Sequence, residues 1–136
     1  MDIKNEWTPP PFHKKYGYID DECIALCDAI NKLDGLETTY SCCGHNKGFF
    51  YIFVNPKSDI HKLAKLNEVL QKVIHWLPME QWQIRVDSRG DHISFLLHSE
   101  SVGKQAVEES NVIAMIINKV VEPIGTDVQF DNKWNQ

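Results

Sequence analysis

The densest group of chemically active side chains lies in one short stretch, residues 38–48, which reads TTYSCCGHNKG. The stretch offers two thiols, an imidazole and an ammonium group, from Cys42, Cys43, His45 and Lys47. Gly44 and Gly48 can adopt left-handed backbone conformations, which let neighbouring amides point inward. The sequence therefore predicts a concave loop in which backbone amides, together with the imidazole and the ammonium group, bind an anionic ligand.

A zinc site is one chemistry that these residues allow. Its ligands would be three thiolates and one imidazole, from Cys23, Cys27, Cys42 and His45. However, Cys23 and Cys27 also fall in the apolar stripe of a predicted helix, where free cysteine packs as a small hydrophobic side chain. Zinc motifs usually contain two tightly spaced ligand pairs, which this sequence lacks. We therefore predict a protein without bound metal.

Covalent catalysis is a second chemistry, because a cysteine thiolate next to a base is a nucleophile. Cys42 or Cys43 would be the nucleophile and His45 the base. Catalytic Cys and His residues normally meet through the fold, so adjacency along the chain is weak evidence for such a pair. We interpret the thiols as lining of a ligand site, and the sequence leaves open whether the protein is an enzyme.

A second polar group lies in residues 82–99, where apolar and polar residues alternate. Arg85, His92 and His98 fall on the polar face of this predicted hairpin. Arg and His side chains suit a phosphate or a carboxylate, although a solvated strand face has the same composition. With an aromatic ring to stack on a base, the predicted ligand site comprises Tyr40, Ser41, Cys42, Gly44, His45, Lys47, Arg85, His92 and His98.

Residues 47–54, KGFFYIFV, partly follow the RNA-recognition pattern K/R-G-F/Y-G/A-F-V-x-F/Y. The fourth position is Phe50 instead of Gly or Ala, and the last is Val54 instead of an aromatic residue. Both faces of this strand are apolar. We therefore interpret its aromatic side chains as core, and we predict a central strand that is covered on both faces.

The periodicity of apolar residues predicts the elements that position these side chains. Three-to-four spacing predicts helices over residues 20–34, 59–77 and 104–122, and the side chain of Asp20 is expected to cap the first. Alternation and residue type predict strands over residues 36–41, 49–54, 82–88 and 92–99, with a short final strand over 127–130. The order α-β-β-α-β-β-α predicts an α+β sandwich, in which amphipathic helices pack on a mainly antiparallel sheet.

The chain of 136 residues is predicted to form a single α+β domain over residues 20–136, preceded by a Pro-rich arm over residues 1–19. Three consecutive prolines make residues 9–11 extended. Aromatic residues on either side would pack the arm across the domain or across a second subunit. The sequence therefore leaves open a homodimer through the N-terminal arm.

Composition excludes several classes of protein. The net charge of −5 lacks the broad positive field on which binding to duplex nucleic acid depends. No apolar run approaches the ~20 residues of a membrane span, and the first residues do not resemble a signal peptide. We therefore predict a cytoplasmic protein with reduced thiols and with neither a membrane nor duplex nucleic acid as a partner.

The sequence TYSCCGH at residues 39–45 resembles the T-x-S-C-S-G-R loop of the tRNA wybutosine-synthesising methyltransferase family. The residues that match are Ser41, Cys42 and Gly44, while Cys43 stands for the serine and His45 for the arginine. The stretch is also similar to an S-C-C-G-H loop in uncharacterised small bacterial and bacteriophage proteins. The resemblance implies a small α+β fold and a loop that lines a pocket for a nucleoside or nucleotide-like ligand.

Taken together, these features predict a small-molecule-binding protein that holds an anionic, nucleotide-derived ligand, and so sequesters it, without a cofactor. The resemblance supplies a first alternative, an RNA-modifying enzyme with S-adenosylmethionine as its cofactor. A second alternative is a structural or interaction protein whose contacts are made by the Pro-rich arm.

Overall fold

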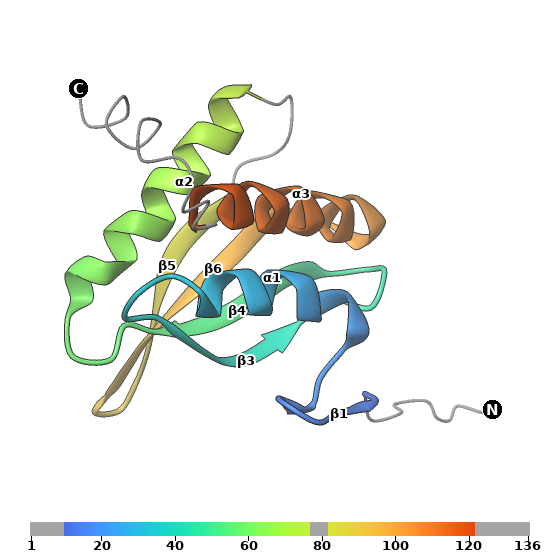
Figure 1. Cartoon of the computed structure of the whole chain (residues 1–136). Helices are drawn as coiled ribbons and strands as arrows, with labels where there is room; N and C mark the ends of the chain where they lie inside the picture. Colours follow the sequence, from blue (N-terminus) through green and yellow to red (C-terminus); the bar gives the residue numbers. More distant parts are fainter. Residues whose placement is uncertain (1–9, 77–81, 122–136) are drawn as a thin grey trace.

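The computed structural model of the chain describes residues 10–76 and 82–121, and these residues form an α+β fold, as predicted (Figure 1). The helices are α1 (Asp21–Asn31), α2 (Leu63–Trp76) and α3 (Gly103–Val121), with a short 3-10 turn, η1 (Ile60–Lys62), before α2. The strands are β1 (Phe12–His13), β2 (Gly17–Tyr18), β3 (Glu37–Cys42), β4 (Phe49–Asn55), β5 (Trp82–Arg89) and β6 (His92–Val102). The order of the elements from α1 to α3 is the predicted one. The predicted strand at 127–130 lies outside the described residues.

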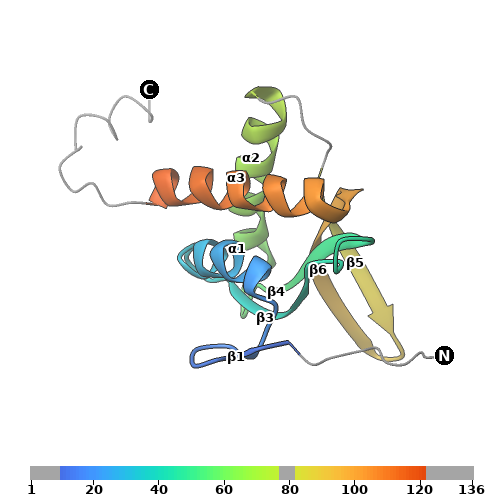
Figure 2. The same ribbon diagram turned by 90° about the vertical axis from the view of Figure 1, so that its right-hand side faces the viewer.

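Strands β3 to β6 form one antiparallel sheet in the order β3-β4-β6-β5. The three helices lie on one face of this sheet, with α1 against β3 and α3, and with α2 against β5 and α3 (Figures 1 and 2). The core lies between the two layers. It consists of inward-facing residues of the strands and the apolar stripes of the helices, including Phe50, Ile52, Leu97, Leu26, Ile30, Ile113 and Ile117.

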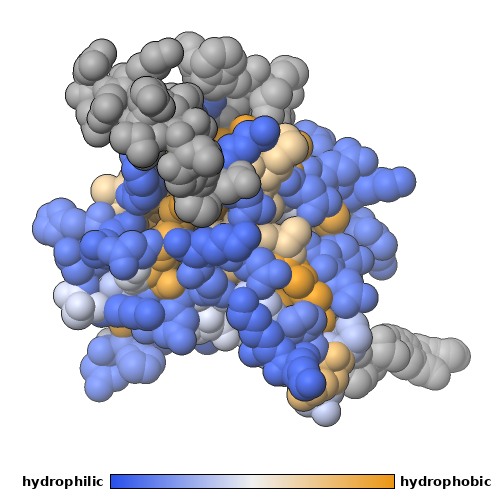
Figure 3. Space-filling view, in the orientation of Figure 1, coloured by the Kyte–Doolittle hydropathy of each residue, from blue (hydrophilic) through white to orange (hydrophobic). Residues whose placement is uncertain are grey.

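The outward faces of the helices are polar, as their three-to-four periodicity requires. In the orientation of Figure 1, the surface of the described residues is largely hydrophilic, with apolar residues in small separate areas (Figure 3). Among the described residues, no helix is long and apolar enough to cross a membrane.

The prediction that β4 is covered on both faces is wrong. Phe50, Ile52 and Val54 are buried under the helices, whereas Phe49, Tyr51 and Phe53 point to the opposite face, which no described helix covers. Tyr51 and Phe53 are nevertheless only partly exposed, because aromatic rings on neighbouring strands shield one another. The sequence prediction took the apolar side chains on this second face of β4 as core, but in the structure they form an aromatic surface.

The prediction that Asp20 caps α1 is also wrong in its chemistry. Asp20 occupies the N-cap position, but its side chain accepts no hydrogen bond from the first turn of the helix. The carboxylate points instead toward the loop after β3, where Oδ2 accepts a hydrogen bond from the amide of Cys43 at 3.2 Å. A tertiary contact thus replaces the local cap.

The N-terminal segment contains secondary structure that the sequence did not indicate. Strands β1 and β2 form a small antiparallel hairpin, where only an extended arm was predicted. Tyr16, between these strands, donates a hydrogen bond from its hydroxyl to Oδ1 of Asp28 at 2.5 Å, and Nδ2 of Asn31 donates to the same hydroxyl at 3.1 Å. The hairpin is therefore attached to the side of α1. Residues 1–9, with the first of the three prolines, lie outside the described residues.

A buried polar network connects the sheet to α3. Glu109, in α3, accepts hydrogen bonds from Nε1 of Trp82 at 2.9 Å and from Oγ of Ser101 at 2.6 Å. Gln105 donates a third at 2.9 Å. Because the carboxylate is buried, these bonds compensate the hydration that it loses on folding. The network fixes α3 relative to β5 and β6.

Candidate functional site

The predicted site residues divide into two groups in the structure. Four of them line one hollow of about 850 Å³ on the uncovered face of the sheet: Tyr40, Arg85, His92 and His98. Three others line a smaller hollow of about 490 Å³ beside the loop after β3: Ser41, Cys42 and His45. Tyr40 belongs to both hollows. Gly44 and Lys47 lie within the loop itself, between β3 and β4.

Aromatic rings form a continuous strip across the uncovered face. Tyr51 and His98 are partners in the register of β4 and β6, and their rings lie nearly parallel, at 11° and 6.3 Å between centroids. Phe49 also contacts His98, at 4.9 Å between centroids. On the opposite flank, Tyr40 lies 6.2 Å from both Tyr51 and Phe53. Together these rings present a surface on which a planar group can stack.

Two rings at the centre of this strip are neutral near pH 7. Partial burial lowers the pKa of His98 below its usual value. Partial burial, together with the neighbouring Cys42 and Tyr40, raises the pKa of Tyr51 to about 12. Neutral rings can stack on a ligand without the cost of desolvating a charge. Both rings can therefore stack on a ligand in their neutral forms.

Charged groups lie at the β5 side of the same hollow. Arg85 pairs with Glu100 at 2.5 Å, and Arg89 pairs with Asp87 at 3.1 Å. A guanidinium group has five N–H donors, so each arginine retains donors after its ion pair. His92 is the register partner of Arg89 at the end of the hairpin, and both side chains are exposed. Donors for an anion therefore line the β5 side of the hollow, with Arg85 level with Phe53 and with Arg89 and His92 at the hairpin end.

The loop after β3 has an unusual backbone. Gly44, His45 and Asn46 all have positive φ, at 84°, 50° and 68°. A Cβ atom at Gly44 would lie 2.3 Å from the carbonyl oxygen of Gly48, so only glycine fits there. Non-glycine residues in this conformation are strained, and such strain is maintained only when the surrounding contacts enforce it.

The amides of this loop do not form the predicted anion-binding concavity. The amides of Lys47 and Gly48 both donate to the carbonyl of Gly44, at 3.0 and 2.9 Å. Those of Gly44 and His45 donate to the thiols two residues earlier, both at 3.4 Å. Because these donors are engaged inside the loop, they close the turn and are not directed at a ligand. The sequence showed that the loop contains glycines, but it did not show that its amides would donate hydrogen bonds to groups within the loop.

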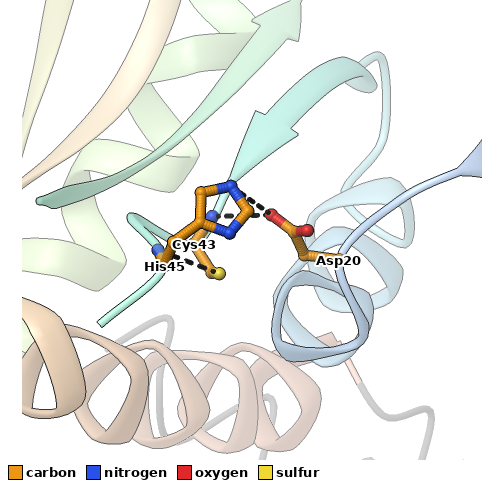
Figure 4. A group of neighbouring side chains, drawn as sticks. All are labelled: Asp20, Cys43 and His45. Atoms are coloured by element: carbon orange, nitrogen blue, oxygen red, sulfur yellow. Dashed lines mark hydrogen bonds and ion pairs between the residues drawn. The ribbon is translucent and has the colours of Figure 1, made fainter. Parts of the chain in front are cut away.

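The cysteines are placed differently from the Cys3His set that the sequence allowed. Cys23 and Cys27 are buried in the core, where burial raises the pKa of both thiols and Ser41 is their hydrogen-bonding neighbour. Cys43 and His45 lie instead beside Asp20, with one donor atom from each residue within 4.8 Å of the others (Figure 4). Asp20 was not among the predicted site residues, since nothing in its sequence context distinguishes it from an ordinary helix cap.

Sequence reasoning also missed Phe49 and Phe53 as surface residues. The KGFFYIFV segment places these aromatic residues at alternate positions of one strand, but it does not show which face of the sheet the helices cover. Comparison of the chain with protein-family models, with curated proteins and with solved structures gives no match. The resemblance of the loop to the wybutosine-synthesising methyltransferases therefore stays a prediction, and the function is argued from geometry alone.

Proposed function

We propose that the uncovered face of the four-stranded sheet binds a nucleotide. The observation that carries the proposal is the hollow in which a strip of aromatic rings leads to two arginines and His92. The class of ligand is the one predicted from the sequence. Of the predicted site residues, the proposed site keeps Tyr40, Arg85, His92 and His98, and it leaves out those of the loop after β3.

The aromatic strip supplies the site for a base. Tyr40, Tyr51 and Phe53 come from the two neighbouring strands β3 and β4, and their rings lie about 6 Å apart. Stacking of a base on an aromatic side chain contributes about 1–3 kcal/mol and tolerates any base. This part of the hollow therefore favours a planar ring but does not distinguish one base from another.

The arginines and His92 supply the site for phosphate. Leu96 lies beside Phe53 across the β4–β6 ladder, and His92 lies four residues before Leu96 on the same strand. At about 3.3 Å per residue, the aromatic strip and the Arg89–His92 end are about 13 Å apart. Arg85 lies at the aromatic end of this span, level with Phe53, since both residues pair with Leu96. This span suits a nucleotide whose phosphates extend along β5, with charge-assisted hydrogen bonds to the guanidinium groups.

The volume and charge also favour a small ligand over a nucleic acid. Ligand pockets commonly occupy about 300–1,000 Å³, and the hollow of about 850 Å³ falls in this range. Each arginine is already paired with a carboxylate, so the face lacks the excess of positive charge that a long phosphate backbone requires. A mononucleotide or dinucleotide needs only one or two such contacts.

Isothermal titration calorimetry tests the proposal with a panel of nucleoside mono-, di- and triphosphates, dinucleotides, short single-stranded oligonucleotides and S-adenosylmethionine. We expect a nucleotide to bind, and we expect Tyr51→Ala and Arg89→Ala each to weaken it about tenfold, which corresponds to ~1.4 kcal/mol. Matched controls are Phe12→Ala, an exposed ring in β1, and Lys119→Ala, an exposed charge near the end of α3. Both should leave the affinity unchanged.

Two results would contradict the proposal. The first is the absence of binding across the panel. The second is binding that survives both Tyr51→Ala and Arg89→Ala, since the ligand would then lie elsewhere. Tighter binding of oligonucleotides than of any nucleotide would assign the face to single strands, and preference for S-adenosylmethionine would favour an RNA-modifying enzyme.

A further inference from the structure

A second cluster of reactive side chains lies outside the proposed nucleotide site. It joins the residue before α1 to the loop after β3 and consists of Asp20, Cys43 and His45 (Figure 4). One carboxylate oxygen, the thiol sulfur and one imidazole nitrogen all lie within 4.8 Å of one another. Nε2 of His45 is 3.8 Å from Oδ2 of Asp20. Three different kinds of metal ligand therefore converge at one point.

We propose that this cluster binds one zinc ion through the Asp20 carboxylate, the Cys43 thiolate and the His45 imidazole. Calcium and magnesium prefer oxygen ligands alone, and this donor set contains one oxygen ligand, one nitrogen and one sulfur. Zinc is borderline in softness and accepts thiolate, imidazole and carboxylate in one tetrahedral site. The proposal concerns a different site from the nucleotide face and does not depend on it. It replaces the prediction of a metal-free protein.

The separations require only a small adjustment on binding. Zinc lies about 2.0–2.3 Å from such ligands, so donor atoms around a tetrahedral ion are about 3.5 Å apart. The Asp20–His45 separation of 3.8 Å is already close to this value. The side chain of His45 is 59% exposed, so its imidazole can rotate without disturbing the core. Cys43 and Asp20 are held in place by burial and by the bond from the Cys43 amide.

Asp20 is a buried carboxylate whose charge a cation would offset. The residue is only 9% exposed, and its Oδ2 accepts the hydrogen bond from the Cys43 amide and lies 3.8 Å from Nε2 of His45. A carboxylate that stays ionised in a buried position loses hydration, which is costly. A bound cation would neutralise this charge.

The surroundings of the cluster also leave a fourth coordination position accessible. Asp20 and His45 face the hollow of about 490 Å³ that Tyr40 also lines. Zinc sites with three protein ligands take water or another small ligand in the fourth position. The strained backbone from Gly44 to Asn46 sets where His45 leaves the loop, so that its ring lies on the Asp20 side. The loop conformation thus has a function in presenting the ligand.

Titration of chelator-treated protein with cobalt(II), followed by displacement with zinc(II), tests the site. Tetrahedral cobalt gives visible absorption, and a thiolate ligand adds a charge-transfer band in the near ultraviolet. We expect one metal ion per chain and both spectral signatures. Cys43→Ser should abolish the charge-transfer band, whereas Cys42→Ser, the matched neighbouring thiol, should retain it. His45→Ala and Asp20→Asn should each weaken metal binding at least tenfold, while His61→Ala and Asp21→Asn should not.

The controls make each outcome decisive. His61 is exposed and lies beside the carboxylate of Asp59, so it tests whether any surface His–Asp pair binds the ion. If Cys43→Ser does not fold by circular dichroism, the exposed His45→Ala variant decides the question. The proposal is overturned if the protein binds no zinc at micromolar concentration, if the charge-transfer band persists without Cys43, or if His45→Ala binds as tightly as the parent protein.

Discussion

The amide of Cys43 donates a hydrogen bond to Oδ2 of Asp20 at 3.2 Å, across a sequence separation of 23 residues. This bond attaches the end of β3 to the start of α1, and it determines where the loop after β3 lies. The same carboxylate faces His45, so one tertiary contact both stabilises the fold and assembles the candidate metal site.

Removal of this acceptor should destabilise the metal-free protein. Asp20→Ala leaves the buried Cys43 amide without its partner, and we expect the free energy of unfolding to fall by about 1–3 kcal/mol. Asp20→Asn retains a side-chain oxygen and should recover part of the loss. Urea denaturation in the presence of a chelator measures both. Asp21→Ala is the control, because Asp21 is exposed in the first turn of α1. A comparable loss of stability in Asp21→Ala would indicate that the carboxylate acts through the helix dipole and not through the Cys43 amide.

Gly44→Ala should disrupt the loop, because its new methyl group would meet the Gly48 carbonyl oxygen at 2.3 Å. We expect a loss of stability of several kcal/mol and a loss of cobalt binding. Gly17→Ala is a matched control, since Gly17 has a similar φ of 79° but no atom within 4 Å of the added Cβ. Gly17→Ala should cost only about 1–2 kcal/mol, the strain of the left-handed backbone. Equal losses in thermal unfolding would contradict the steric explanation.

Tyr16→Phe should reveal the attachment of the N-terminal hairpin through its pH dependence. Partial burial and the hydrogen bond to Asp28 raise the pKa of Tyr16 above its usual value. Partial burial raises the pKa of Asp28, but hydrogen bonds from Tyr16 and Lys15 lower it by more. The pKa of Asp28 therefore lies below its usual value. A lowered carboxyl pKa stabilises the fold above the unfolded pKa, about 4, and this stability is lost as the pH falls through the folded pKa.

We therefore expect Tyr16→Phe to lower the free energy of unfolding by about 1–2 kcal/mol at pH 7. The difference from the parent protein should shrink as the pH falls below about 4 and through the lowered pKa of Asp28, where the carboxylate becomes protonated in the folded protein. Urea denaturation at pH 7 and at pH 3 measures this. Tyr18→Phe, in β2 of the same hairpin, changes an exposed hydroxyl and should have no effect at either pH. A constant Tyr16→Phe difference would show that the carboxylate has no part in the attachment.

Trp82→Phe should weaken the buried network of Glu109. The smaller phenyl ring would still pack near Phe50, but the Nε1 donor to the Glu109 carboxylate would be lost. We expect a loss of about 1–3 kcal/mol, the cost of removing a donor from a buried charge. A double-mutant cycle with Glu109→Gln separates packing from the hydrogen bond. Strictly additive effects of the two substitutions would contradict a coupled network.

Cys42 should be the thiol that iodoacetamide modifies first in the native protein. Cys23, Cys27 and Cys43 are buried, and burial raises the pKa of each, to about 12 for Cys43, so that their nucleophilic thiolate forms are scarce. Cys42 is partly exposed at the end of β3. Peptide mapping by mass spectrometry after brief alkylation at pH 8 should show one adduct, and denaturation should expose all four thiols. Early modification of Cys43 would show that the loop opens.

The sequence by itself determined the elements from α1 to α3 and their order, but not the hairpin of β1 and β2. The apolar stripe that contains Leu26 and Ile30, and the alternation around Leu97, depend only on spacing along the chain, so they predicted the helices and strands. The polar residues Arg85, His92 and His98 were placed on one face for the same reason. Alternation also put Phe49, Tyr51 and Phe53 on one face of β4, but it gave no sign of whether helices cover that face.

Only the tertiary structure decided what lies on each face and which loop meets which helix. All three helices pack on one side of the sheet, which turned the aromatic residues of β4 into a surface. Asp20 joined Cys43 and His45 because its carboxylate bonded an amide 23 residues away instead of its own helix. Local periodicity holds no information on such contacts, because they depend on which groups lie close together in the folded chain. Both candidate sites consist of residues that only the tertiary structure brings together.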